Sequence, residues 1–184
     1  MIGAMKNHGF TLIELMISIG IIGILVAASV FSYGNIRDRA QGNKVAADFQ
    51  QIKLGWEIWK SSSNAVYPRE VGGDNPDVPC YPEPAMDQTV VQPFLGDIHR
   101  DPWNIRYDYD NDGDSFTGAG SLERGVNVAL HWCPGNGARY LKLAPFIDST
   151  LDGGDGNTTG KVRWFTNPNI SGGIYFLIAV NENS

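Results

Sequence analysis

The residues most suggestive of chemistry form an acidic segment in the second half of the chain. It runs Asp108-Tyr109-Asp110-Asn111-Asp112-Gly113-Asp114-Ser115. The carboxylates alternate and Gly113 permits a tight turn, as in the first half of an EF-hand calcium loop. Calcium prefers hard oxygen ligands. The spacing therefore predicts a Ca²⁺ site whose ligands are Asp108, Asp110, Asp112 and Asp114.

The rest of this segment departs from an EF-hand. The twelfth loop position, which carries a bidentate glutamate in an EF-hand, is Ala119 here. Glu123 or a distant oxygen would have to complete the shell. The alternative interpretation is a solvated acidic turn, because Asp, Asn and Gly are ordinary turn residues.

A second acidic cluster follows, formed by Asp148, Asp152 and Asp155 among several glycines. Its spacing is irregular. It could bind another ion or supply the missing ligands of the first site. The alternative is a flexible loop without an ion.

Catalytic patterns are weak. His131 and Cys133 would share a face of a strand, and a pair of core residues explains them better than a nucleophile and its base. The sequence holds no glycine-rich phosphate loop and no Gly-x-Ser-x-Gly elbow. No Cys/His spacing suits zinc. We therefore expect the protein not to be an enzyme.

The chain has two cysteines, Cys80 and Cys133. A disulfide between them is expected if the folded part lies outside the cytoplasm. Two buried free thiols are the alternative. The apolar segment at the start of the chain favours export, and hence the disulfide.

One acid interrupts that apolar segment. Glu14 lies in the stretch Phe10–Phe31, whose 22 residues would give about 33 Å of helix, enough to cross a bilayer. A charge near the start of a membrane helix costs roughly 2.5–3.5 kcal/mol on insertion scales. A secretory signal peptide has a shorter apolar region than this stretch. Neither that interpretation nor a simple anchor explains Glu14.

Residues 9–16, Gly-Phe-Thr-Leu-Ile-Glu-Leu-Met, resemble the processing motif of type IV prepilins and type II secretion pseudopilins. The resemblance implies that a prepilin peptidase cleaves between Gly9 and Phe10 and that Phe10 is then N-methylated. It also implies that Glu14 pairs with the N-terminal amine of a neighbouring subunit. Unpaired charges are costly in hydrocarbon, so this pairing would specify the registry between subunits.

The helix is expected to continue to about Lys60, for about 51 residues in all. One face of its second half is apolar at helical spacing, and we expect that face to pack against a sheet. It comprises Val45, Phe49, Ile52, Trp56 and Trp59. Strand-like segments follow at 104–109, 126–132, 138–143, 162–165 and 174–180. This order predicts an α+β fold with a small antiparallel sheet.

The same layout resembles the pilin fold, in which a long N-terminal helix packs on an antiparallel sheet. Arg100-Asp101-Pro102-Trp103-Asn104 resembles the Asp-Pro-Trp segment of the major pseudopilin of type II secretion, and Tyr67-Pro68 fits the same family. That family implies a structural calcium. The expected divisions are a leader at 1–9, a transmembrane helix at 10–31, the soluble half of the helix at 32–64 and a globular domain at 65–184.

The net charge of −6 and the lack of a basic run argue against nucleic-acid binding. We expect a single-pass protein of the bacterial inner membrane that polymerises, most simply as the pseudopilus of a type II secretion system, with its C-terminal domain in the periplasm or on the cell surface. Implied partners are further copies of the chain, minor pilins or pseudopilins, the prepilin peptidase and the inner-membrane assembly platform. The alternatives are a type IV pilus subunit in adhesion, motility or DNA uptake, and an anchored calcium-binding protein that never polymerises.

Overall fold

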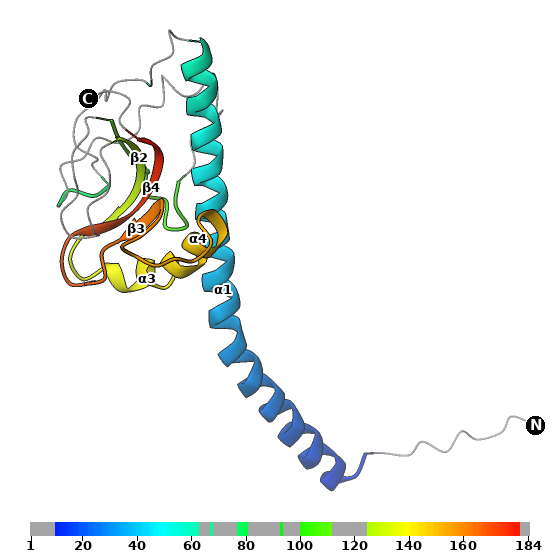
Figure 1. Ribbon diagram of the computed structural model, residues 1–184. Coiled ribbons are helices and arrows are strands. Elements are labelled where there is room, and N and C mark those ends of the chain that lie inside the picture. The colour runs from blue at the N-terminus through cyan, green and yellow to red at the C-terminus, as the bar shows by residue number, and fades with distance from the viewer. Residues whose placement is uncertain are drawn as a thin grey trace, which may run out of the picture. The chain divides into compact units, whose positions relative to one another are not determined.

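The computed structural model describes residues 10–62, 67, 77–80, 93, 100–111 and 125–180. Its contacts divide the chain into two units, residues 1–37 and 38–184. The elements are α1 (Leu12–Ser62), β1 (Asp108–Asp110), β2 (Gly125–Trp132), α3 (Gly137–Leu141), α4 (Ala144–Leu151), β3 (Val162–Trp164) and β4 (Gly172–Val180) (Figure 1). One long helix followed by a four-stranded antiparallel sheet confirms the predicted α+β, pilin-like layout.

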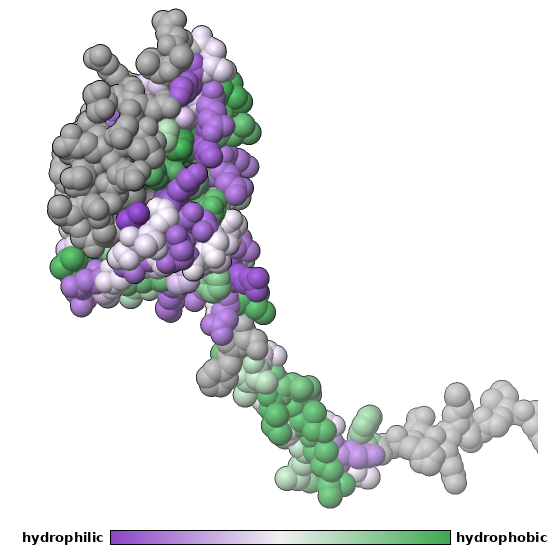
Figure 2. Space-filling view, in the orientation of Figure 1, coloured by the Kyte–Doolittle hydropathy of each residue, from purple (hydrophilic) through white to green (hydrophobic). Residues whose placement is uncertain are grey.

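Helix α1 has 51 residues, which confirms the length expected from the sequence. Its large apolar side chains between Leu12 and Ile36 are more than half exposed wherever the structure describes them. Figure 2 shows these apolar residues around the N-terminal part of the helix. Within the described part of the chain, α1 is the one helix that is long and apolar enough to cross a membrane.

The strands are ordered β1-β2-β4-β3, and every neighbouring pair is antiparallel. Alternate side chains therefore point to opposite faces of the sheet. Val128, Leu130 and Phe176 belong to the main core on one face, whereas Ala129 and Tyr175 form a small second cluster with Leu177 on the other. All eight residues of β2 are buried, so both faces of this strand are covered.

The second half of α1 supplies the helical side of the main core. Val45, Phe49, Ile52 and Trp56 are buried and Trp59 packs against them, which confirms the predicted apolar face. The Phe49 ring lies 5.4 Å from that of Tyr107 and 6.0 Å from that of Phe176, between ring centroids. Aromatic contacts at these distances stabilise a core beyond the area that they bury.

The strand predicted at 138–143 is wrong, because the chain forms α3 and α4 in this region. The short alternation of apolar and polar residues there also fits a helix. Buried Tyr140, Leu143, Ala144 and Ile147 follow one another at spacings of 3, 1 and 3, which is a helical pattern. The strand predicted at 104–109 is shorter than expected, since only Asp108–Asp110 forms a strand. The other three predicted strands are confirmed as β2, β3 and β4.

A glycine of α1 allows close contact with α4. A Cβ atom built on Gly42 would lie 2.7 Å from the Cβ of Phe146 and 3.3 Å from the carbonyl oxygen of Leu143. The first distance is shorter than real Cβ contacts. Any larger residue at position 42 would therefore push α4 away from α1.

Candidate functional site

The N-terminal end of α1 forms a capping box. Thr11 precedes the first helical residue, and Glu14 stands three positions further on, which is the spacing of this motif. The Glu14 carboxylate accepts hydrogen bonds from the backbone N–H and the hydroxyl of Thr11, both at 2.8 Å. The N–H of Glu14 donates to the Thr11 hydroxyl oxygen at 3.3 Å. The acid that looked unexplained in the sequence therefore has local partners within a single chain.

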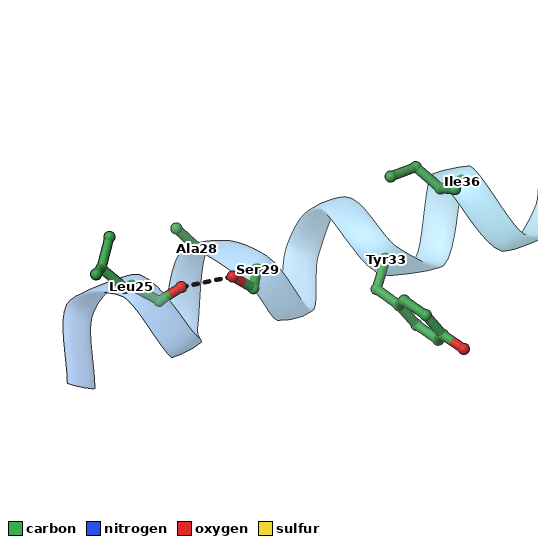
Figure 3. A pocket seen from close by; sticks show the side chains of 5 residues that line it. All are labelled: Leu25, Ala28, Ser29, Tyr33 and Ile36. Atoms are coloured by element: carbon green, nitrogen blue, oxygen red, sulfur yellow. Dashed lines mark hydrogen bonds between the residues drawn. The ribbon is translucent and has the colours of Figure 1, made fainter. Parts of the chain in front are cut away.

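The other polar groups of the apolar stretch are also satisfied within the helix. The hydroxyls of Ser18 and Ser29 donate to the carbonyl oxygens of Glu14 and Leu25, both at 2.7 Å. Such internal bonds let a hydroxyl reside in hydrocarbon at low cost. Ser29 also lines a shallow hollow on the helix surface (Figure 3), whose other residues are Leu25, Ala28, Tyr33 and Ile36.

The residues predicted for processing lie at the edge of the described chain. Gly9 is outside the described residues, and Phe10 stands just before α1 with 87% of its surface exposed. Their predicted roles remain predictions.

In the predicted calcium loop, Asp108 makes a buried contact that sequence reasoning missed. Its carboxylate accepts a hydrogen bond from Nδ1 of His131, and Nε2 of that ring lies 2.9 Å from the hydroxyl oxygen of Tyr175. All three residues are at most 1% exposed. Strand register brings them together, because Ala129 pairs with both Asp108 and Tyr175 and His131 follows two residues later. The spacing of residues along the sequence does not reveal this register.

The remainder of the predicted loop is described only in part. Asp110 is buried in β1, whereas Asp112 and Asp114 lie outside the described residues. The contact of Asp108 with His131 engages one oxygen of a predicted ligand. Calcium binding by this loop remains a prediction.

The structure brings the second predicted cluster together. One carboxylate oxygen from each of Asp148, Asp152 and Asp155 lies within 4.8 Å of the others, a spacing that could hold a metal ion. Asp148 is buried in the last turn of α4, and the other two follow in the loop that leads to β3. Within the described residues, this group is the one that meets the geometric requirement for a metal centre.

The two cysteines are joined by a disulfide. Cys80 and Cys133 have Cα atoms 5.6 Å apart and close a loop with a sequence separation of 53. The same short segment is held by Asp77, whose carboxylate accepts from Arg100 at 3.1 Å and from Nε of Arg106 at 2.9 Å. These bonds hold the pKa of Asp77 below its ordinary value, and the bond from the Arg106 side chain has the largest effect.

A polar contact also fastens α1 to the sheet side of the core. Asp48, which is 5% exposed, accepts a hydrogen bond from the hydroxyl of Tyr107 at 2.7 Å and from Nζ of Lys44 at 2.6 Å. Lys44 also donates to the carbonyl oxygen of Arg100 at 2.6 Å. Burial, followed by the Asp48 charge, raises the pKa of Tyr107 far above its ordinary range, so the phenol stays neutral and donates.

We expect Asp48→Ala to lower the free energy of unfolding by about 3 kcal/mol, because it leaves the buried Tyr107 hydroxyl without this acceptor and removes an ion pair. Tyr107→Phe keeps the charge pair and should cost only about 1 kcal/mol. Chemical denaturation of both variants measures the difference. Equal losses from the two variants would contradict the interpretation.

The Asp-Pro-Trp segment forms a tight turn that packs on α3. Asp101 accepts hydrogen bonds from the N–H groups of Trp103 and Ile105 at 2.8 and 2.7 Å. The Trp103 ring lies 4.6 Å from that of Tyr140, between centroids. Burial raises the pKa of Asp101. Asn104 has a φ of 68°, a backbone conformation that Asn tolerates better than most residues.

Comparison with known proteins agrees with these features. Residues 4–30 match the family described as the prokaryotic N-terminal methylation motif. The chain is 30% identical over 114 residues to the type II secretion system core protein G of Vibrio cholerae, covering 61% of this chain and 76% of that protein. It is 26% identical over 108 residues to the core protein G of Pectobacterium carotovorum, covering 59% of this chain and 69% of that relative.

A second kind of relative shares a shorter region. A probable minor fimbrial protein of Dichelobacter nodosus is 42% identical over 52 residues, which are 28% of this chain and 33% of that protein. No solved structure gives a significant match. The prepilin-type motif, the pilin-like layout and the extended similarity to core protein G together show that this chain belongs to the type IV pilin-like family, as a relative of the type II secretion system core protein G.

Proposed function

We propose that this protein is a structural subunit of a helical filament, the pseudopilus of a type II secretion system. The observation that carries the proposal is a single acid, Glu14, at the start of a helix whose N-terminal apolar surface is exposed. An apolar surface of this kind needs lipid or other helices around it. In a filament, copies of the same helix would provide that cover after leaving the bilayer.

Assembly would change the partners of Glu14. In the isolated chain its carboxylate is bonded to Thr11, so the acid is partly satisfied before assembly. A carboxylate has about four acceptor sites on its two oxygens, and both hydrogen bonds from Thr11 reach Oε2 of Glu14. The terminal amine of a neighbouring subunit, created by cleavage before Phe10, would be the additional partner.

A type IV pilus subunit is the second candidate. The similarity to a probable minor fimbrial protein favours it, but that similarity covers only 28% of this chain. The similarity to the core protein G of Vibrio cholerae extends over 61% of the chain, which favours secretion. A membrane-anchored calcium-binding protein that never polymerises would leave the prepilin-type motif without a use.

The domain organisation and partners follow from this function. Residues 1–9 would be the leader, 10–31 the transmembrane helix, 32–64 its soluble half and 65–184 the periplasmic domain. The partners would be other copies of the chain, minor pseudopilins, the prepilin peptidase and the assembly platform of the bacterial inner membrane. The function is mechanical, and none of the related proteins described above is named as an enzyme.

Mass spectrometry of the mature N-terminus tests the proposal most directly. In a host with a prepilin peptidase, we expect the chain to begin at Phe10 and to carry a methyl group on its amine. A host without the peptidase is the control and should yield the uncut chain. A mature protein that keeps residues 1–9 in the first host would refute the processing step.

We also propose that Ca²⁺ stabilises the folded domain. Two acidic segments of the chain support this, and oxygen-only ligand sets favour hard cations such as Ca²⁺. Removing the ion with a chelator should lower the melting temperature of the full-length protein in detergent, and added Ca²⁺ should restore it. An unchanged melting temperature would count against a bound structural ion.

A further inference from the structure

A buried carboxyl group lies where the Asp-Pro-Trp turn packs on α3. Asp101 is 4% exposed, and its Oδ1 accepts the two hydrogen bonds that hold the turn, from the N–H groups of Trp103 and Ile105. Its Oδ2 is also buried but has no hydrogen-bond partner in the described part of the chain. A buried carboxylate oxygen without a partner is costly, so a native structure that keeps one needs a reason.

The residues of α3 beside Asp101 are polar and closely packed. Tyr140 is fully buried, and its hydroxyl oxygen accepts a hydrogen bond from Nη2 of Arg139 at 2.9 Å. The Arg139 guanidinium lies over the Trp103 ring, 4.6 Å from its centroid. Nε of Arg139 is buried and, among the described residues, has no acceptor. An unused donor and the unused acceptor of Asp101 therefore belong to the same small cluster.

The groups around Asp101 act on its charge in opposite directions. Burial has the largest effect and raises the pKa of Asp101. The bonds from the turn, the Tyr140 hydroxyl and the Arg139 charge lower it, but burial prevails. Burial also raises the pKa of Tyr107 and of Tyr140, so both phenols stay neutral. The charged or titratable groups that surround the cluster are Arg139 and Tyr140 of α3, Arg100 and Tyr107 on either side of the turn, and Lys44 and Asp48 of α1.

We propose that Asp101, Tyr140 and Arg139 form a proton-sensitive latch between the Asp-Pro-Trp turn and α3, which holds more firmly when Asp101 takes up a proton. The neutral carboxyl group gains a donor at Oδ2. The Tyr140 hydroxyl oxygen has two lone pairs, so it can accept from this donor while it still accepts from Arg139. Oδ1 can keep both bonds of the turn in either state. This inference depends neither on filament assembly nor on a bound ion.

The sign of the pH dependence follows from the raised pKa of Asp101. An acid whose pKa is higher in the folded than in the unfolded state stabilises the fold fully below its ordinary pKa of about 4. That contribution is lost as the pH rises through the folded pKa, so at neutral pH the fold bears the cost of a buried charge. Asp77 is the opposite case, because its pKa is lowered and its contribution is lost as the pH falls.

Melting curves of the full-length protein in detergent, recorded between about pH 4 and pH 7, test the latch. Asp101→Asn keeps an oxygen for the turn and offers an N–H group to Tyr140 without a charge. It should melt at least about 2 °C above the wild type at neutral pH. The difference should shrink as the pH falls, because the wild type then becomes neutral at this position too. Asp77→Asn is the matched control and should melt below the wild type at neutral pH.

Two further measurements separate the two oxygens and the cation. Asp101→Ala also removes the acceptor of the turn, so it should melt below Asp101→Asn at every pH. Carbon-13 NMR should show the Asp101 carboxyl of the wild type titrating above the range of exposed aspartates, and at still higher pH in Arg139→Gln. The latch would be overturned by an Asp101→Asn protein that melts no higher than the wild type at neutral pH, or whose advantage is independent of pH. An Asp101 carboxyl that titrates in the ordinary range would overturn it as well.

Discussion

Glu14→Ala should leave the protein inserted and processed but reduce its incorporation into filaments by roughly tenfold or more. The expected reason is that the charged partner of the neighbouring amine is lost in a medium where unpaired charges are costly. Sheared filament yield, measured beside the amount of mature protein in the membrane, gives the ratio. The ratio matters because a variant that is simply degraded would lower both quantities together.

Two further variants separate the charge of Glu14 from its capping role. Glu14→Gln keeps an oxygen that can accept from Thr11 but removes the charge, and we expect it to fail as Glu14→Ala does. Thr11→Val removes the hydroxyl that bonds Glu14 but keeps the charge, and we expect it to retain most of the assembly. Normal assembly by Glu14→Gln would show that the capping box, not the charge pair, explains the motif.

Removing the disulfide should cause the largest loss of stability. The loop closed by Cys80 and Cys133 has a sequence separation of 53, for which the chain-entropy relation gives about 4 kcal/mol. For a domain of this size, that loss lowers the melting temperature by on the order of 10 °C. The double variant Cys80→Ser/Cys133→Ser and the reduced wild type should agree, because both lack the same constraint. Thermal denaturation of the full-length protein in detergent measures it.

The single variants supply the control for the disulfide. Each leaves one free thiol and should lose about as much stability as the double variant, since either change opens the loop. If the double variant has the same melting temperature as the oxidised wild type, then the hydrogen bonds of Asp77 with Arg100 and Arg106 hold this segment without the disulfide.

The long helix could be predicted because its evidence is local. The core face of α1 repeats at the helical period over many residues, and neither register nor distant contacts are needed to find it. The helices α3 and α4 are short, and the alternation in Ala138–Leu143 fits a strand as well as a helix. The spacing of Tyr140, Leu143, Ala144 and Ile147 indicates a helix when the four residues are considered together.

The polar contacts could be predicted only in part. The three acids Asp148, Asp152 and Asp155 could be identified in the sequence. Their close approach in the structure depends on the end of α4 and on a glycine-rich loop, and their spacing along the chain does not predict it. The contact of Asp108 with His131 depends on how β1 and β2 pair. Nothing in the order of residues fixes that register in advance. The sequence therefore identifies the acidic residues but not the groups that contact them.

The bonds of Asp48 have a consequence for how α1 can move. A helix held by apolar side chains alone can slide along a sheet by one turn, about 5.4 Å, and find comparable contacts. Such a slide would carry Asp48 away from the Tyr107 hydroxyl and Lys44 away from the Arg100 carbonyl. Separating the buried Tyr107 hydroxyl from the buried Asp48 carboxylate is costly, whereas the contact of Lys44 with the Arg100 carbonyl is exposed and adds little. The polar contacts therefore oppose a slide of α1 by one turn and fix its position against the sheet.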